Sequence, residues 1–324
     1  MMRDLISRVS KYSLSTMFLN RRTSHYSSMT PKTPTEPTEA EQKTLESWRH
    51  LFESKKYKSD LNALPGIDEP VFGFEIEWVD LSAHGDLQVT FSENMEHTLA
   101  CGNQVLKEQY SDRIMSTRPV IRVVNLPANR YYEMSELRMR DRSRLLSFDA
   151  IVVMTSPAIG WLKNSVYQCN DCESKWTINE RLARPREKVT YCRKCLEEIQ
   201  DDLRSKKPKS FHKDPTDISM VVEENFYEDI QYLEVVSPQM ILDGKADNGE
   251  VYQVVVFDEY VGQFSRGDML TINAEVAVDP LVNRDFIRDT RRMIFLKSHS
   301  IEEGFSNEAN HSIDESVLES LPPK

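Results

Sequence analysis

The sequence lacks the short motifs that mark the common enzyme classes. It has no G-x-x-x-x-G-K-[ST] phosphate loop, no G-x-S-x-G and no H-E-x-x-H. These absences remove the sequence signatures of a P-loop ATPase, an α/β-hydrolase and a zincin protease. The seven histidines are scattered, and Asp258 and Glu259, adjacent in a strand-like run, are expected to point to opposite faces of a sheet. We therefore expect a protein that is not an enzyme.

Positive charge and long apolar runs are also scarce. No run of about 18 apolar residues occurs, so we expect no membrane-spanning helix and no membrane partner. The net charge of -11 argues against a protein coated in positive charge, although a local basic patch remains compatible with it. The 324 residues suffice for one large or two medium domains with sizeable cores.

The two ends of the chain have unusual compositions. Residues 1–30 are basic, rich in Ser and Thr, and contain one acidic residue, Asp4. This composition fits an organellar transit peptide, but we favour a disordered tail that continues into a linker rich in Pro and Thr, together residues 1–40. Residues 302–324 are polar and acidic and are expected to be disordered. The expected location is the cytoplasm or nucleoid of a prokaryote, or the nucleus of a eukaryote, and an organelle is less favoured.

The folded part divides into two patterns. Helical periodicity at residues 38–64 and 91–110, with strand-like runs at 71–81 and 118–127, predicts a small, mostly helical unit over residues 41–128. Strand-like runs then dominate residues 129–301, at 144–160, 228–238, 250–261, 268–280 and 291–301. The predicted fold class is therefore α+β. The helical unit precedes a small Greek-key barrel, for which an OB-fold is the leading candidate, and a cysteine-rich insertion at residues 166–200 interrupts the barrel after its first strands.

The insertion contains four of the five cysteines, as the C-x-x-C pairs Cys169/Cys172 and Cys192/Cys195 with 19 residues between them. Two such pairs about 15–20 residues apart are a strong zinc signature. Four thiolates complete a tetrahedral set and leave no position open to water, so the predicted Zn²⁺ is structural. An iron–sulfur cluster and a pair of disulfides are the alternatives. The fifth cysteine, Cys101, is expected to be a buried free thiol.

Two details of the insertion qualify the zinc prediction. No H-x-E precedes the pairs, and Tyr191 stands where a zinc deaminase has proline, so a deaminase site is excluded. Glu173 and Leu196 follow the two pairs at positions where many zinc ribbons have glycine, because the backbone there adopts a positive φ. The sequence therefore predicts distorted knuckles.

The order of these parts resembles the N-terminal domain of the minichromosome maintenance (MCM) replicative helicases. The stretch VVNLPANRYYEMSELRMRDRSRLLSFDAIVVMTSPAI resembles the start of that family's barrel, and YQCNDC…YCRKC resembles its zinc insertion. YEDIQYLEVVSP is similar to its D-x-Q strand, with Asp229 and Gln231 in place. FSRGDMLTINAEV is similar to its P-G-D turn, with Arg266 in place of proline. The resemblance covers roughly residues 41–302 and lacks the family's ATPase motif.

The resemblance implies where nucleic acid would bind. In the family, a hairpin between the last two barrel strands projects into a central channel and contacts DNA. At that position this sequence has the candidates Arg284, Arg288, Arg291, Arg292 and Lys297. A second basic cluster leads into the first barrel strand, and its candidates are Arg138, Arg140 and Arg144. Arginines on a projecting ribbon can neutralise phosphates and release counterions. A solvated charged loop is the alternative.

Aromatic residues accompany the second cluster. Tyr131, Tyr132 and Phe148 interleave with its arginines, and Trp161 follows the next strand. OB-folds bind single strands through a basic groove with stacking aromatics, but some of these rings are expected in the core, so they rank below the arginines. A third basic run, residues 204–214, is expected to be a solvated linker.

The sequence thus predicts a non-catalytic DNA-binding protein of replication or repair, with single-stranded DNA favoured over duplex DNA. The resemblance implies a homo-oligomer, a hexamer in the family, or a place in an MCM helicase ring. One alternative is a protein-interaction module that modulates a helicase ring without touching DNA, which the acidic charge supports. Another is an RNA-binding zinc–OB protein.

Overall fold

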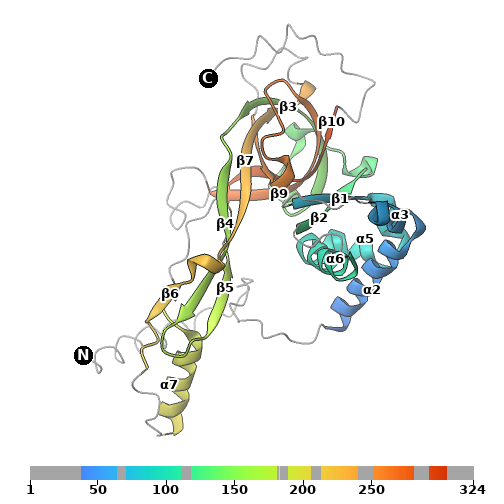
Figure 1. The fold of residues 1–324 in the computed structure, drawn as a ribbon. Helices are drawn as coiled ribbons and strands as arrows, with labels where there is room; N and C mark the ends of the chain where they lie inside the picture. The colour runs from blue at the N-terminus through green and yellow to red at the C-terminus, as the bar shows by residue number, and fades with distance from the viewer. Residues whose placement is uncertain are drawn as a thin grey trace. The chain divides into compact units, whose positions relative to one another are not determined.

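The computed structural model describes residues 38–63, 71–110, 118–180, 182, 189–205, 213–239, 251–280 and 292–304 (Figure 1). The predicted disordered tails lie almost entirely outside these ranges, as does the basic run at 206–212. The tails, the transit peptide and the domain boundaries therefore stay predictions. Among the described residues, no helix has the length and apolar character needed to cross a bilayer.

The N-terminal unit contains five helices and one pair of strands among the described residues. The helices are α2 (Glu39–Glu53), α3 (Lys55–Ala63), α4 (Trp78–Ala83), α5 (Leu87–Glu93) and α6 (Met95–Tyr110). The strands β1 (Val71–Glu77) and β2 (Arg118–Val124) pair in parallel. The unit has its own core, which the apolar face of α2 supplies with Leu45, Trp48, Leu51 and Phe52, as the periodicity of the sequence predicts.

Two of the predicted elements are divided in the structure. The helical pattern at residues 38–64 breaks at Ser54, which has extended backbone angles (φ -58°, ψ 148°) between α2 and α3. The strand-like run at 71–81 ends at Glu77, and Trp78 begins α4. Helix α6 lies close to α2 and β2 because Gly102 has no side chain: a Cβ there would be 2.5 Å from Ile121 Cδ1 and 2.8 Å from Trp48.

The second part of the chain contains eight strands and one α-helix among the described residues. They are β3 (Leu145–Thr155), β4 (Ile159–Cys169), β5 (Lys175–Asn179), α7 (Arg193–Ser205), β6 (Ile218–Met220), β7 (Phe226–Val236), β8 (Tyr252–Phe257), β9 (Met269–Pro280) and β10 (Arg292–Glu303). Three short 3₁₀ turns lie between β2 and β3, at η1 (Ala128–Arg130), η2 (Met134–Glu136) and η3 (Met139–Asp141). Two more, η5 (Val222–Glu224) and η7 (Asp258–Tyr260), lie before β7 and after β8.

Five of these strands close into a ring in the order β3-β9-β10-β8-β7, because β7 pairs back onto β3. Only one neighbouring pair in the ring, β8 and β10, is parallel, and the others are antiparallel. A closed five-stranded barrel of this kind is the OB-fold. Its interior is filled by alternate apolar side chains, which on β3 are Leu146, Phe148, Ala150 and Val152. The predicted fold class is confirmed.

The insertion follows a single ring strand, β3. The first half of β4 pairs with β7 beside the barrel, and its second half pairs with β5 and β6. Figure 1 shows β4 running from the ring to β5, β6 and α7. We call the second half of β4 together with β5, α7 and β6 the cysteine lobe. It includes β6, which lies after the predicted insertion limit at residue 200 and returns the chain to β4.

A buried charged network joins β2 to the barrel. The Arg122 guanidinium donates to Glu259 Oε1 at 2.7 Å, to Glu259 Oε2 at 2.8 Å and to the His299 carbonyl at 2.9 Å. Burial lowers the pKa of His299 to about 3, so the imidazole is neutral and its Nε2 accepts the Val123 N–H at 2.8 Å. The helical unit and the barrel are therefore connected through buried polar groups that hydrogen-bond to one another.

The expectation that Asp258 and Glu259 lie on a strand with opposite orientations is wrong. Both residues lie in η7, just after β8, and Asp258 has a positive φ of 55°. The Asp258 carboxylate pairs with Arg118 and the Glu259 carboxylate pairs with Arg122, so both face β2. The two carboxylates therefore have a structural role, which is to form ion pairs with arginines of the helical unit.

Candidate metal centre and nucleic-acid surface

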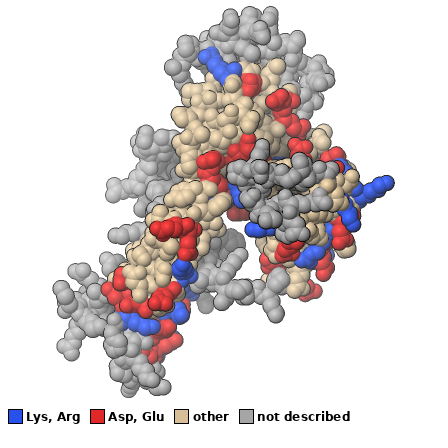
Figure 2. All heavy atoms as spheres, in the orientation of Figure 1, with Lys and Arg blue, Asp and Glu red and all other residues tan. Residues whose placement is uncertain are grey.

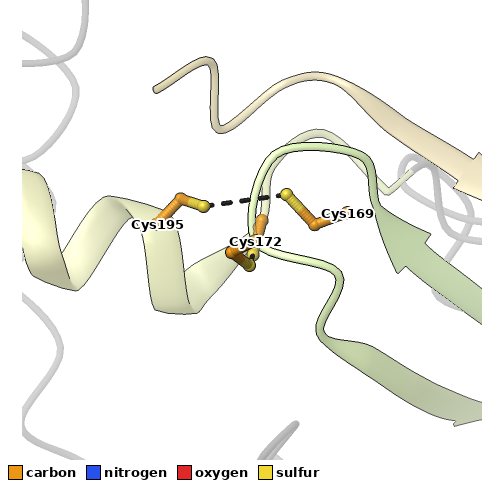
Figure 3. A group of neighbouring side chains, drawn as sticks. Cys169, Cys172 and Cys195 are labelled. Carbon is orange, nitrogen blue, oxygen red and sulfur yellow. Dashed lines mark hydrogen bonds between the residues drawn. The ribbon is translucent and has the colours of Figure 1, made fainter. Parts of the chain in front are cut away.

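The structure brings the four predicted cysteine ligands together at the tip of the cysteine lobe. Cys169 is the last residue of β4, and Cys172 lies in the turn that leads to β5. Cys192 directly precedes α7, and Cys195 lies in its first turn. Figure 3 shows Cys195 on the helix facing Cys169 and Cys172 on the turn. One half of the cluster thus comes from a β-turn and the other half from a helix start.

The sulfur separations fit a single tetrahedral ion. Cys169 Sγ lies 3.7 Å from Cys195 Sγ, and Cys172 Sγ lies 3.6 Å from Cys192 Sγ. All four sulfur atoms lie within 4.8 Å of one another. A tetrahedron with Zn–S bonds of ~2.3 Å has sulfur separations of ~3.8 Å, close to these values. A disulfide needs ~2.05 Å, so the four cysteines are free thiols rather than two disulfides.

The unusual residues after each pair have separate explanations. Glu173 adopts a positive φ of 55°, the conformation for which ribbons commonly use glycine, and its N–H donates to the Cys169 carbonyl at 2.9 Å. Leu196 lies inside α7, where a helical conformation is required and glycine would be unfavourable. The second pair is therefore a helix start rather than a second knuckle.

The surroundings of the sulfurs act in opposite directions on their ionisation. Burial raises the pKa of the Cys169 and Cys195 thiols, so thiolate forms at these two positions need a nearby positive charge. Burial also acts on Cys172, but hydrogen bonds from Ser174 outweigh it and lower the pKa of that thiol to about 6. The Ser174 hydroxyl lies 2.9 Å from Cys172 Sγ and 3.5 Å from Cys192 Sγ. No motif in the sequence singles out this serine, which follows Cys172 by two residues.

The basic segment between the last two barrel strands lies largely outside the described residues. Its stem is described: β9 and β10 are antiparallel partners up to Pro280 and Arg292. Arg284, Arg288 and Arg291 fall in residues 281–291, and the Arg292 side chain is also outside the described set. Lys297, on β10, lies 3.5 Å from Glu275 on β9, and its side chain is partly exposed. Contacts of this segment with nucleic acid stay a prediction.

The second predicted cluster is described, and most of its cations are already engaged. Arg138 donates to the carbonyls of Ser135 and Leu137 at 2.8 and 2.7 Å. Arg144 donates to Asp141 Oδ1 at 2.7 Å and lies over the Tyr132 ring. Arg140 is exposed and has no hydrogen bond or ion pair to another described residue. Of the three predicted arginines, Arg140 has the most freely available guanidinium.

The aromatic residues near this cluster divide between surface and core. Phe148 is completely buried inside the barrel, and Trp161 packs against Phe257 with ring centroids 6.4 Å apart. The Tyr131 hydroxyl donates to Asp149 Oδ2 at 2.7 Å. Tyr132 is half-buried, and the Arg144 guanidinium lies over its ring. Of the four aromatic residues, Tyr132 is therefore the one in contact with a predicted DNA-binding arginine.

The charged surface shows no continuous basic patch among the described residues on the face drawn in Figure 2. Lys and Arg side chains are scattered there among Asp and Glu, most visibly over the cysteine lobe and the helical unit. Much of the barrel surface carries neither sign of charge on that face. On this face, electrostatic attraction to a polyanion would therefore depend on a few positions rather than on a broad field.

Motif residue Gln231 has a structural role. Its Nε2 donates to the Ser156 carbonyl at 2.7 Å, and its Oε1 accepts the Gly262 N–H at 2.9 Å. It therefore connects the start of the insertion to the turn after β8. Arg118 and Arg122, which connect the helical unit to the barrel, were not singled out in the sequence, because arginines in a strand-like run carry no signal of their burial.

Comparison with known proteins supports the fold. No protein-family model matches the chain, and no curated protein matches it by sequence. The structure is similar to the crystal structure of the N-terminal domain of an archaeal MCM, with a TM-score of 0.59. The similarity covers 82% of this chain and 100% of that chain at 16% sequence identity. The resemblance inferred from the motifs is thus confirmed at the level of the fold.

Proposed function

From the fold shared with an MCM N-terminal domain, we propose that this protein is a non-catalytic DNA-binding protein of replication or repair that prefers single-stranded DNA. The observation that carries the proposal is the similarity to the whole of that solved domain, helical unit, barrel and four-cysteine lobe together. The Zn²⁺ of this proposal is structural: it would be held by Cys169, Cys172, Cys192 and Cys195 and would fix the lobe.

The contacts with DNA are proposed to come from the segment that the β9–β10 hairpin presents. Its stem strands pair as far as Pro280 and Arg292, and three of the proposed arginines stand in the sequence between these two residues. The face drawn in Figure 2 carries no continuous basic patch among the described residues, which predicts weak binding by a single copy. Self-association would place several copies of the segment around one strand and raise their effective concentration. The proposal therefore includes an oligomer, with a hexameric ring as its expected form.

A salt titration tests the proposal. Binding of fluorescent oligothymidine is measured by anisotropy for the wild type and for the variant Arg288→Ala/Arg291→Ala/Arg292→Ala. For single strands the slope of log K against log[salt] is about -0.7 for each phosphate contact. Losing three contacts should therefore make the slope shallower by about 2 for each bound copy. Duplex DNA and RNA of matched sequence give the preference, and single-stranded DNA should bind most tightly.

A matched control separates a site from net charge. The variant Arg49→Ala/Arg193→Ala/Arg204→Ala removes the same charge from α2 and α7, where these arginines lie beside Glu108, Glu197 and Asp201. Its slope should equal that of the wild type. If both triple variants lost the same amount of DNA affinity, the effect would come from net charge and not from a site. Absent or salt-independent binding of the wild type would contradict the DNA proposal.

The second candidate function is a protein-interaction module that acts on a helicase ring without binding DNA. The observation that favours it is the mixed, locally acidic surface of the cysteine lobe (Figure 2). The same titration distinguishes the two candidates, because this module would show no binding to any of the three nucleic acids at low salt. An RNA preference would instead support the zinc–OB alternative of RNA metabolism.

A further inference from the structure

Three potential metal ligands from two helices converge at the edge of the N-terminal unit. Glu41 lies in the first turn of α2, and His97 and Cys101 lie on α6. The last two are four residues apart, so they occupy the same face of their helix. Helix α2 is fixed against α6 by the Trp48 Nε1–H bond to the Thr98 carbonyl at 2.9 Å. The convergence is therefore part of a packed interface between helices.

The three ligand atoms are close enough to share one ion. Cys101 Sγ lies 3.8 Å from His97 Nε2, and these atoms and a Glu41 carboxylate oxygen all lie within 4.8 Å of one another. In a tetrahedral zinc site with bonds of ~2.3 Å to sulfur and ~2.05 Å to nitrogen, the two ligand atoms are ~3.6 Å apart. Cys101 is 3% exposed, and Glu41 and His97 are half-buried, so an ion would be reached from one side.

The Glu41 side chain does not form the helix-capping hydrogen bond that is common at its position. Thr38 caps α2 by accepting the Glu41 N–H at 3.3 Å, and a glutamate three residues after such a cap commonly bonds back to the cap N–H. That reciprocal bond does not occur here, and the Glu41 carboxylate forms no ion pair with any described residue. Instead it lies near the His97 imidazole, whose side-chain contact within the described part of the chain is to Cys101.

We propose that Glu41, His97 and Cys101 form a second metal site, separate from the four-cysteine centre, and that it binds Zn²⁺. A thiolate, an imidazole and a carboxylate are the ligands that zinc takes in proteins, and thiolate with imidazole disfavours Mg²⁺ and Ca²⁺. Three protein ligands leave a fourth position open to water, whereas the four-cysteine centre is closed. The second ion is therefore the more readily exchanged of the two, and it links the start of α2 to α6.

Equilibrium dialysis of the full chain against rising free zinc tests this site. Elemental analysis should find two zinc ions for each wild-type chain at high free zinc, and the weaker one should be missing from His97→Gln and from Cys101→Ser. His50→Gln, the same substitution at an exposed position of α2, is the matched control and should keep both ions. Cobalt provides a second readout, because a thiolate–cobalt absorption band assigned to the weaker site should vanish in Cys101→Ser.

Fold integrity is followed by circular dichroism and thermal unfolding in each variant. If Cys101→Ser fails to fold, His97→Gln carries the test alone, because its side chain is half-exposed. Starting from protein that holds one ion, added zinc should raise the Tm of the wild type further and should leave the Tm of His97→Gln unchanged. A wild type that holds one zinc across the whole range, or variants that keep two, would overturn the proposal.

Discussion

Replacing Cys169 by serine is expected to remove the zinc of the four-cysteine centre and to unfold the cysteine lobe. The apolar cluster at the tip of the lobe consists, among the described residues, of Cys169, Cys192 and Cys195 with Cys172 and Trp176 packed against them. So small a cluster cannot offset the conformational entropy of ordering the lobe. Structural zinc contributes about 10–16 kcal/mol of apparent binding energy in zinc-finger peptides, and here it should decide whether the lobe folds.

The measurement is zinc content together with hydrogen exchange of the lobe. Cys169→Ser should lose one zinc for each chain and the protection of β5 and α7, while the barrel strands keep theirs. A chelator strong enough to strip the wild type should have the same effect. Thr177→Ser, an exposed position on β5, is the control and should change neither quantity. A zinc-free protein whose lobe remains fully protected would refute the structural role.

Arg122→Met is expected to be the most destabilising single substitution outside the metal centre. Its side chain is 6% exposed and donates to Glu259 and to the His299 carbonyl, so removing it leaves a carboxylate and a carbonyl without their donor. Breaking a buried ion pair from one side typically costs about 3–5 kcal/mol. The cost should appear as loosened contact between β2 and the barrel, because these partners lie in η7 and β10.

Urea unfolding of zinc-loaded protein measures this cost. Arg49→Met is the matched control, since Arg49 makes an exposed ion pair with Glu108 at 3.5 Å and should cost about 0–1 kcal/mol. In the double variant Arg122→Met/Glu259→Leu, part of the loss should be recovered, because no charged partner is left buried. Equal stability of Arg122→Met and Arg49→Met would show that the network contributes nothing specific to the connection between the helical unit and the barrel.

The parts that could be predicted from the sequence are those that short-range patterns determine. Two C-x-x-C pairs predict a four-sulfur cluster because the two cysteines of each pair lie close together, here on a turn and on a helix start. The apolar face of α2 and the alternating strands similarly contain their own burial signal. The order of the motifs then predicted the barrel and an early insertion, although the insertion follows one ring strand, β3, and not two.

The remainder depends on contacts between distant residues. Near the break at Ser54 and the start of α4 at Trp78, the Tyr57 ring contacts Phe74 and its hydroxyl accepts the Glu77 N–H at 3.0 Å. A local propensity does not reveal such contacts. The pairing of Arg122 with Glu259, 137 residues later, requires the fold itself. The spacing of His97 and Cys101 was visible as a four-residue interval, but the third ligand, Glu41, comes from another helix and only the structure brings it there.

The most direct test of the central proposal is the mass of the protein in solution, measured by light scattering with and without single-stranded DNA. We expect a species heavier than one chain that binds the oligonucleotide. We also expect the single-stranded DNA to strengthen the assembly. A single chain whose mass is the same with and without DNA, at low salt and with its zinc in place, would contradict it.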